Sequence, residues 1–410
     1  MDPVMNPYAP GAGQRPPELA GRDEQLKAFS VVLERIARGR PERSMVLTGL
    51  RGVGKTVLLN ALRSAAVRAK WGTGKLEARP DQRLRRPMAA ALHMAVRELG
   101  HPRGEELDHV LGVIKAFAQR EAPGARLRDR WNPGIDAPAV SGRADSGDIE
   151  IDLVELLTDV AGLAADVGKG VAVFVDEMQD LGTEDVSALC AACHELSQSA
   201  QPLIVVGAGL PHVPAVLSAS KSYSERLFRY SRIDRLDRAQ AERALRTPAQ
   251  DEGADFEPDA LEAMYSATGG YPYFIQAYGK AVWDLAPRSP ITADDVRVGA
   301  PEAEIELAVG FFGSRFERAT PGEREYLRAM AHLGAQPPPD EHEGRSRGGE
   351  AGHSADSVTT ADVAAHLDRT PQSLSPARDS LLKKGLIYSA ERGRIAFTVP
   401  HFGRYLRARS

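Results

Sequence analysis

The first half of the chain alternates short apolar runs with longer stretches of helical periodicity. We predict strands over residues 44–48, 75–78, 171–175, 203–206 and 232–236. Such alternation is typical of an α/β domain built on a parallel sheet, here expected over 18–236. Residues 121–147, between the second and third strands, are rich in Gly, Pro and polar residues and are expected to form a disordered insert.

From residue 237 onward the apolar positions follow a helical period. Helices are expected over 237–249, 257–270, 271–286 and 291–300, because Asp, Thr or Pro marks their starts and Gly marks their ends. These form a helical lid subdomain, 237–319. A third domain, 320–410, is split by a second Pro- and Gly-rich stretch, 336–357, that is expected to be disordered. Its three predicted helices and β-hairpin resemble a winged helix-turn-helix.

The sequence "VLTGLRGVGKTVLL" (46–59) carries the first candidate chemistry. Residues 49–56 fit G-x-x-x-x-G-K-[ST], between a predicted strand and a predicted helix. Glycines let backbone N–H groups approach phosphates, and the helix N-terminus favours the same negative charge. Lys55 would reach the β- and γ-phosphates, and Thr56 would hold Mg²⁺. The residues expected to bind a nucleoside triphosphate are Gly49, Gly52, Val53, Gly54, Lys55, Thr56 and Val57.

The second motif is "GVAVFVDEMQDL" (170–181), an apolar strand that ends in two carboxylates. A buried parallel strand delivers such residues to the ligand edge of the sheet. Asp176 would hold Mg²⁺, and Glu177 would orient and polarise the attacking water. The alternative is an acidic pair at a helix N-terminus. Glu177 favours a hydrolase over a simple nucleotide switch.

Loop, strand-Asp-Glu and helical region, in this order, resemble the AAA-plus ATPases. Within them, "ELAGRDEQL" (18–26) is similar to the N-terminal motif of the origin-recognition-like ATPases and their STAND relatives. This resemblance implies ATP with Mg²⁺ as the ligand and places Gly21 and Arg22 beside the adenine. "YSERLFRY" (223–230) resembles the segment that carries the arginine finger, so that Arg226 would act on a neighbour's γ-phosphate in a homo-oligomer. A surface salt bridge is the alternative for Arg226.

Two departures from the family bear on the rate of hydrolysis. The fourth strand ends in Gly207-Ala208-Gly209, where many AAA-plus proteins place a polar residue that senses the γ-phosphate. Tyr273 stands near the lid position where they commonly carry an Arg, and Gly270-Tyr271-Pro272 looks like the STAND relatives. Less charge stabilisation in the transition state implies slow hydrolysis unless a partner assists.

Charge is unevenly distributed along the chain. The net charge is −4, yet residues 359–410 carry nine Lys or Arg against four Asp or Glu. This basic segment suggests an anionic partner such as double-stranded DNA; a solvated basic face or a protein-docking winged helix is the alternative. The candidates for DNA contact are Gln372, Ser373, Ser375, Arg378, Lys383, Lys384, Arg392 and Arg394.

Other features narrow the interpretation. Cys190 and Cys193 form a C-x-x-C that lacks a second pair, so buried small residues on a helix are the better account than zinc. Residues 1–17 are expected to form a flexible leader without a signal peptide. No apolar run is long enough to span a membrane, and the cytoplasm is the expected location.

The sequence therefore predicts an ATP-binding and ATP-hydrolysing AAA-plus protein whose nucleotide state controls a C-terminal winged helix. One alternative is a DNA-binding regulator or mobile-element helper that ATP loads onto DNA. Another is a non-catalytic ATP switch or scaffold for a protein partner.

Overall fold

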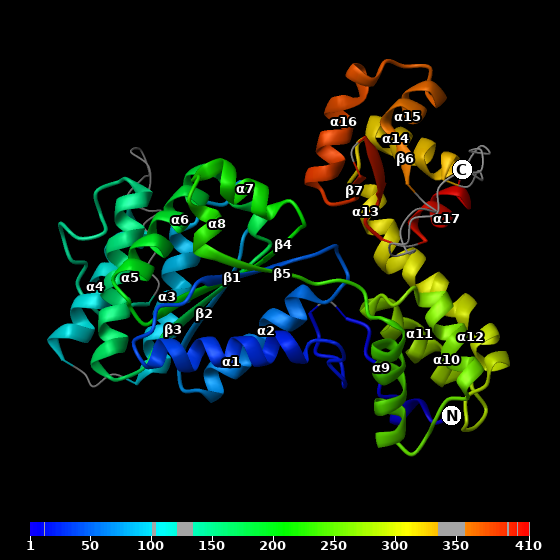
Figure 1. Cartoon of the computed structure of the whole chain (residues 1–410), viewed down its shortest axis with the longest axis horizontal. Coiled ribbons are helices and arrows are strands. Elements are labelled where there is room, and N and C mark those ends of the chain that lie inside the picture. Colours follow the sequence, from blue (N-terminus) through cyan, green and yellow to red (C-terminus); the bar gives the residue numbers. More distant parts are fainter. Residues whose placement is uncertain are drawn as a thin grey trace. The chain divides into compact units, whose positions relative to one another are not determined.

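The structure is a computed structural model that describes residues 1–11, 13–100, 104–120, 134–334, 357–391, 393–399 and 401–409 (Figure 1). The chain divides into two compact units. The sheet unit comprises Gly21–Gly49 and Gly54–Asp234. The helical unit comprises Met1–Ala20, Leu50–Val53 and Arg235–Ser410.

The sheet unit is built on five parallel strands in the order β2-β3-β4-β1-β5. They are β1 (Ser44–Thr48), β2 (Gly72–Glu77), β3 (Val171–Asp176), β4 (Leu203–Gly209) and β5 (Phe228–Arg232). This arrangement confirms the predicted α/β class with the fold of a P-loop NTPase.

The fifth strand lies four residues earlier than predicted. We expected it over 232–236, but Phe228 is buried and pairs with Ser44 of β1. The backbone N–H of Ile233 still donates to the carbonyl of Thr48 (2.7 Å), just past the end of β5. Pairing with β1 therefore fixes the position of this strand, which its own sequence pattern did not.

Helices connect the parallel strands, as such strands require. They are α2 (Lys55–Arg68), α3 (Arg85–Leu99), α4 (Glu105–Gln119), α5 (Ile149–Asp166), α6 (Thr183–Gln198), α7 (Val213–Ser220) and α8 (Ser224–Leu227). Helix α1 (Asp23–Ala37) precedes β1. A short 3₁₀ helix, η3 (Met178–Asp180), follows β3 directly.

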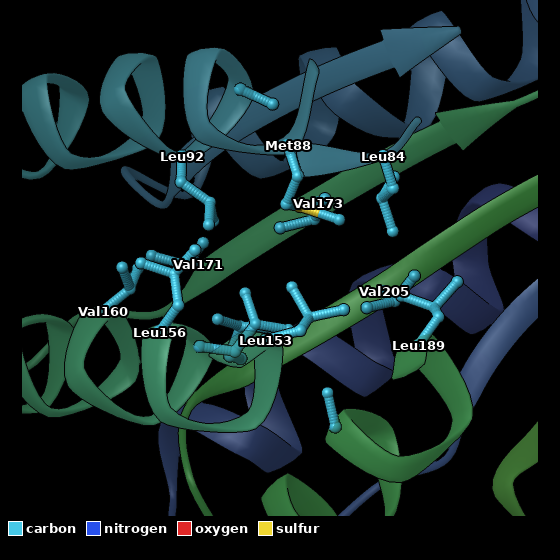
Figure 2. Close-up of a cluster of buried hydrophobic side chains, with 14 of the residues drawn as sticks. Leu84, Met88, Leu92, Leu153, Leu156, Val160, Val171, Val173, Leu189 and Val205 are labelled. Carbon is cyan, nitrogen blue, oxygen red and sulfur yellow. The ribbon is translucent and has the colours of Figure 1, made fainter. Parts of the chain in front are cut away.

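Strand β3 is buried along its whole length. Val171 and Val173 lie in one core with side chains of α3, α5 and α6 (Figure 2). Phe174 belongs to the alternate set of positions, and its ring contacts that of Phe29 on α1 (centroids 6.1 Å apart). Helices thus cover both faces of the sheet, which explains why this strand reads as a continuous apolar run.

The expected insert 121–147 is in part a packed segment. Residues 121–133 lie outside the described residues, but Ile135, Ala137 and Ala144 are buried. Residues 134–147 contain neither helix nor strand, so the prediction of disorder there is wrong. The Pro- and Gly-rich composition reflects an irregular backbone that side-chain contacts hold in place.

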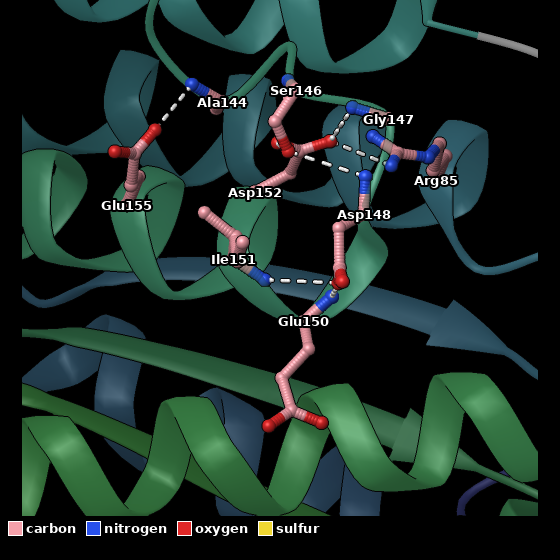
Figure 3. Close-up of polar contacts among 9 residues, drawn as sticks. All are labelled: Arg85, Ala144, Ser146, Gly147, Asp148, Glu150, Ile151, Asp152 and Glu155. Atoms are coloured by element: carbon pink, nitrogen blue, oxygen red, sulfur yellow. Dashed lines mark hydrogen bonds and ion pairs between the residues drawn. The ribbon is translucent and has the colours of Figure 1, made fainter.

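Asp152, on α5, is fully buried and anchors the end of this segment (Figure 3). Its carboxylate accepts hydrogen bonds from Ser146 N (2.8 Å), Ser146 Oγ (2.6 Å) and Gly147 N (3.1 Å). It also pairs with the Arg85 guanidinium (2.6 Å). Burial alone would raise the pKa of Asp152, but the hydrogen bonds from Ser146 and Arg85 outweigh it and hold the pKa below its ordinary value.

We expect Asp152→Asn to lower the free energy of unfolding by about 1–3 kcal/mol, because the amide turns a donor toward groups that donate and leaves Arg85 poorly paired. Chemical denaturation measures this change. The exposed Asp166→Asn, on the same helix, should change stability by less than about 0.5 kcal/mol. Because the folded-state pKa of Asp152 is lowered, the wild-type advantage should shrink as the pH falls through that pKa. Equal stability of both variants would show that this network contributes nothing.

The helical unit contains the expected lid helices. They are α9 (Arg238–Asp251), α10 (Pro258–Thr268), α11 (Pro272–Leu285) and α12 (Ala293–Glu306), followed by a π-helical turn η4 (Leu307–Gly313) and α13 (Ser314–Glu317). Capping boxes begin α9 at Asp237 and α12 at Thr292. Such caps are the sequence signal that placed these starts.

The leader, expected to be flexible, packs on α11. It begins with a short 3₁₀ helix, η1 (Pro3–Met5). Tyr8 is buried, and its hydroxyl donates to the carbonyl of Leu245 (2.5 Å). The Asn6 amide donates to Asp284 (2.7 Å), and Trp283 donates to the carbonyl of Asp2 (2.9 Å). The Pro and Gly content of the leader suggested flexibility. The few side chains that anchor it find their partners far along the chain, so the local sequence does not reveal this packing.

The C-terminal part of the helical unit has three helices followed by a hairpin. The elements are α14 (Pro321–Leu333), β6 (Val358–Thr359), α15 (Thr360–His366), α16 (Pro371–Lys383), β7 (Ile387–Glu391), β8 (Arg394–Phe397) and α17 (Phe402–Arg407). The strands form an antiparallel sheet in the order β6-β8-β7. Residues 336–356 of the second insert lie outside the described residues. Sequence reasoning missed α17, although Phe402, Tyr405 and Leu406 have helical spacing.

Within the helical unit the C-terminal elements pack against the lid helices. The ring of Phe312, in η4, contacts those of Phe274 and Phe402 (centroids 6.0 and 5.7 Å). The Tyr271 hydroxyl donates to the carbonyl of Thr398 (3.0 Å). These contacts join α11, η4 and α17 in one core. In the described part of the chain, no helix is long and apolar enough to cross a membrane.

Candidate functional site

The loop between β1 and α2 has the backbone that a phosphate cradle needs. Gly52 (φ +85°) and Gly54 (φ +90°) adopt the left-handed region, which other residues rarely enter. Gly54 is the N-cap of α2, and no side chain among the described residues caps this helix. Its first N–H groups therefore suit an anion. Lys55, the first residue of α2, is buried.

Asp176 and Thr56 meet at the end of β3. The Thr56 side chain hydrogen-bonds to the Asp176 carboxylate. Asp176 is only 5% exposed; burial raises the pKa of its carboxyl group and the nearby Glu177 adds to this, while the Thr56 bond opposes it. The fold thus brings together the two residues that the sequence assigned to Mg²⁺.

These oxygens fit a magnesium ion. A hydroxyl and a carboxylate are the hard oxygen ligands that Mg²⁺ uses beside substrate phosphates and water. Among the described residues, no group of three or more His, Cys, Asp or Glu side chains gathers as an all-protein metal site. The arrangement therefore suits a cation that completes its shell with a nucleotide.

Glu177 has an unusual backbone (φ +52°, ψ +45°), in the left-handed region. It occupies the N-cap position of η3, yet within the described structure its side chain makes no capping hydrogen bond. The carboxylate instead accepts a hydrogen bond from the Gln179 amide (2.5 Å). Its side chain is thus not used as the helix cap that was the alternative to a catalytic role.

The glycines at the end of β4 make room for the segment that follows β3. A Cβ added at Gly207 would lie 1.9 Å from Met178 Sδ, and one added at Gly209 would lie 2.9 Å from Gln179 Oε1. The same Gln179 oxygen accepts a hydrogen bond from the backbone N–H of Leu210 (3.0 Å). Sequence reasoning missed Gln179, although it stands two residues after Glu177 in the same motif.

We expect Gly209→Ala to lower the free energy of unfolding by about 1–3 kcal/mol, because the added methyl also lies 2.6 Å from Val213 Cγ2. Thermal or urea unfolding measures the change. Gly162→Ala, on α5, is the matched control: its Cβ meets nothing within 4 Å, and removing a helical glycine should be neutral or stabilising. Equal stabilities of the two variants would contradict the close approach.

Gly21 and Arg22 lie at the start of α1. Gly21 is in the left-handed region (φ +69°), and Arg22 is buried. The Arg22 guanidinium donates to the backbone carbonyls of Asp234 (2.7 Å) and Gly21 (3.2 Å). Arg22 thus ties this turn to the segment after β5. Contact of either residue with adenine remains a prediction.

Arg226 lies on the four-residue helix α8 and is exposed. It forms no ion pair with any residue that the structure describes, so the salt bridge that was its alternative role is absent there. Its action on a neighbour's phosphate remains a prediction.

The candidates for DNA contact differ in their exposure and in their internal contacts. Gln372, Ser373 and Lys383, on α16, are exposed. Lys384 instead pairs with Glu323 (2.7 Å), and the Arg394 guanidinium donates to Ser357.

The remaining candidates are less available. Arg378 and Ser375 are half-buried. Arg392 lies outside the described residues. Of the basic candidates that the structure describes, Lys383 alone is classed as exposed. The cluster predicted from charge is therefore partly used inside the C-terminal fold.

The two cysteines lie on α6, and both are buried. Burial raises the pKa of both thiols, that of Cys190 to about 11 and that of Cys193 to about 12. Both cysteines therefore act as small apolar side chains of the core.

Two regions of the chain match models of known protein families. Residues 18–206 match the family model of the AAA ATPase domain, and residues 309–406 match a domain of unknown function (DUF8462). A search among curated proteins finds no match.

Similar solved structures have low sequence identity to this chain. The Walker-type ATPase of Pyrococcus abyssi is 15% identical with a TM-score of 0.59, covering 96% of this chain and 97% of that one. The RuvB Holliday junction branch migration motor of Thermotoga maritima is 17% identical (TM-score 0.45; 97% and 99% covered). The Aeropyrum pernix ORC1 protein, solved in complex with DNA, is 14% identical (TM-score 0.45; 96% and 94% covered).

Proposed function

We propose that this chain, whose residues 18–206 form an AAA-type P-loop ATPase domain, binds ATP with Mg²⁺ and hydrolyses it slowly. The observation that carries hydrolysis is the arrangement at the end of β3. Thr56 and Asp176 are hydrogen-bonded there, and Glu177 follows with its carboxylate unused as a helix cap. A pure nucleotide switch has no need of this second carboxylate.

In the proposed mechanism each residue has one task. Backbone N–H groups of the loop and of the α2 N-terminus bind the phosphates, and Lys55 adds positive charge at the β- and γ-phosphates. Thr56 and Asp176 would hold Mg²⁺, which neutralises charge on the phosphate oxygens. Glu177 accepts a hydrogen bond from the attacking water and so orients and polarises it.

We expect hydrolysis to be slow because few side chains are placed to stabilise the negative charge of the transition state at the γ-phosphate. No polar side chain ends β4, and Tyr273 rather than an Arg follows the lid's Gly pair. Fixed positive or hydrogen-bonding groups at the γ-phosphate are a large part of catalysis in this class. An exposed Arg226 from a neighbouring copy is one way to supply the missing charge.

The proposed output of the nucleotide cycle is a movement of the winged helix together with the lid. Besides the aromatic contacts of Phe312, Arg404 on α17 pairs with Glu304 on α12 (2.9 Å), and His401 hydrogen-bonds to the carbonyl of Ala267 (2.9 Å). Contacts of this extent favour movement as one body over a winged helix that swings free of the lid.

Hydrogen exchange tests whether the winged helix stays packed on the lid in both nucleotide states. With ATP or with ADP bound, the amides of Phe402–Arg407 should keep equal protection, because α17 stays packed on η4. Loss of that protection in one nucleotide state would contradict movement as one body and would favour a released C-terminal domain.

DNA binding is a second candidate, favoured by the exposed polar face of α16. If α16 contacts DNA, Lys383→Ala should weaken duplex binding for all sequences and reduce the slope of log affinity against log salt by about 1. Lys27→Ala, at an exposed lysine of α1, is the matched control. Equal salt slopes for both variants would leave α16 without a role in DNA contact.

A further inference from the structure

A continuous hydrogen-bonded path links the Glu177 carboxylate, the proposed catalytic group, to the end of β4. Gln179 Nε2 donates to Glu177 Oε2 (2.5 Å), and Gln179 Oε1 accepts from the backbone N–H of Leu210 (3.0 Å). Leu210 is the first residue after β4 and is itself buried. One amide side chain therefore connects the ends of the neighbouring strands β3 and β4.

The orientation of this amide is determined by its partners. A carboxylate only accepts hydrogen bonds and a backbone N–H only donates them. The reversed amide would place oxygen against oxygen at Glu177 and nitrogen against N–H at Leu210. A single amide orientation satisfies both partners, so Gln179 presents a donor to Glu177 whenever Leu210 holds its oxygen.

The position of Gln179 is fixed by packing as well. Its oxygen lies where a Cβ on Gly209 would come within 2.9 Å, so a side chain at this position would force Gln179 to shift. The neighbouring Met178 fills the equivalent space over Gly207. The space beside Gly207 and Gly209, at the end of β4, is thus filled by Met178 and Gln179, which follow Glu177 in the chain.

We infer that Gln179 is a positioning residue for ATP hydrolysis: it holds the Glu177 carboxylate and makes its orientation depend on the end of β4. This inference rests on the proposed hydrolysis. Gln179, in η3, brings a polar side chain to the end of β4, which has none of its own. Because Gln179 acts through Glu177, its loss should lower kcat and leave KM for ATP nearly unchanged.

The test separates the donor to Glu177 from the clamp on β4. Gln179→Leu keeps similar volume and loses both hydrogen bonds. Gln179→Glu keeps an acceptor for Leu210 but cannot donate to Glu177. We expect both variants to lower kcat by about 10- to 100-fold, since small misplacement of a catalytic group costs this much, with KM within about twofold of wild type. The controls Gln198→Leu and Gln198→Glu, at an exposed residue of α6, should match wild type.

A coupling measurement shows whether Gln179 acts through Glu177. In a Glu177→Gln background, adding Gln179→Leu should change the residual rate by less than about twofold, because the carboxylate to be positioned is already absent. ATP binding by each variant, measured with a fluorescent analogue, confirms that the site is folded.

Each result decides between specific accounts. Wild-type kcat in Gln179→Glu, with loss only in Gln179→Leu, would reduce Gln179 to a clamp on β4. Wild-type kcat in both variants would overturn the inference while leaving the proposed hydrolysis intact. Equal rates for wild type and Glu177→Gln would instead contradict hydrolysis itself, and the positioning role with it.

Discussion

Replacing Glu177 with Gln is expected to lower the rate of ATP hydrolysis by about 10²–10⁴-fold, the range for loss of a positioned general base. The amide keeps the size of the side chain but cannot take up the proton of the attacking water. The affinity for ATP should stay close to that of wild type, because Glu177 is assigned neither a metal nor a phosphate contact. Single-turnover phosphate release together with equilibrium binding separates the two effects.

Glu184→Gln is the matched control for this variant. Glu184 is an exposed carboxylate in the first turn of α6 and has no assigned role in the site. Its replacement should leave the rate within about twofold of wild type, as expected for a surface change away from the site. A Glu177→Gln variant as fast as the Glu184→Gln control would remove Glu177 from the mechanism.

Replacing Lys55 with Ala is expected to weaken ATP binding by about 10- to 100-fold, which matches the loss of a charge-assisted hydrogen bond worth about 1.5–3 kcal/mol. Lys55 is buried at the N-terminus of α2, so its charge acts in a medium that screens it weakly. Hydrolysis should fall further, since the same ammonium group stabilises charge on the transferred phosphoryl. Isothermal titration with Mg²⁺ and ATP measures the affinity.

Lys27→Ala, which removes an exposed lysine from α1, controls for a general change in charge. If the Lys55→Ala and Lys27→Ala variants bound ATP equally well and hydrolysed it at equal rates, the loop would not be the nucleotide site. A Lys55→Ala variant that binds normally but does not turn over would restrict Lys55 to the transition state.

The features that the sequence predicted well are local. The phosphate loop is specified by eight consecutive residues, and the acidic pair stands directly at the end of an apolar strand. Because successive strands in a parallel sheet all point their carboxyl ends to one edge, local motifs alone placed Thr56 and Asp176 together. The class of the fold followed from the same alternation of strands and helices.

The features that the sequence did not predict depend on distant partners. The side chain of Gln179 is held by a hydrogen bond from the backbone N–H of Leu210, which lies 31 residues away in sequence. Tyr8 finds the carbonyl of Leu245 across a separation of 237 residues. Strand β5 is placed by its register with Ser44 rather than by its own pattern. Composition alone therefore mistook the leader and residues 134–147 for disorder.

The internal contacts of Lys384 and Arg394 have a similar lesson for function. Net charge counts these residues as available to an anion, but Glu323 and Ser357 already use them. The charge of a segment predicts its partners only after its internal pairs are removed. On that basis the case for DNA rests on the exposed residues of α16.

Steady-state phosphate release at saturating Mg²⁺ and ATP, with and without double-stranded DNA, tests the central claim most directly, with Glu177→Gln as the blank. Our account predicts slow turnover by the wild type that stands clearly above the blank; a further rise with DNA would mark a DNA-coupled ATPase. A wild-type rate equal to the blank in both conditions would contradict hydrolysis and would make the chain an ATP-binding switch.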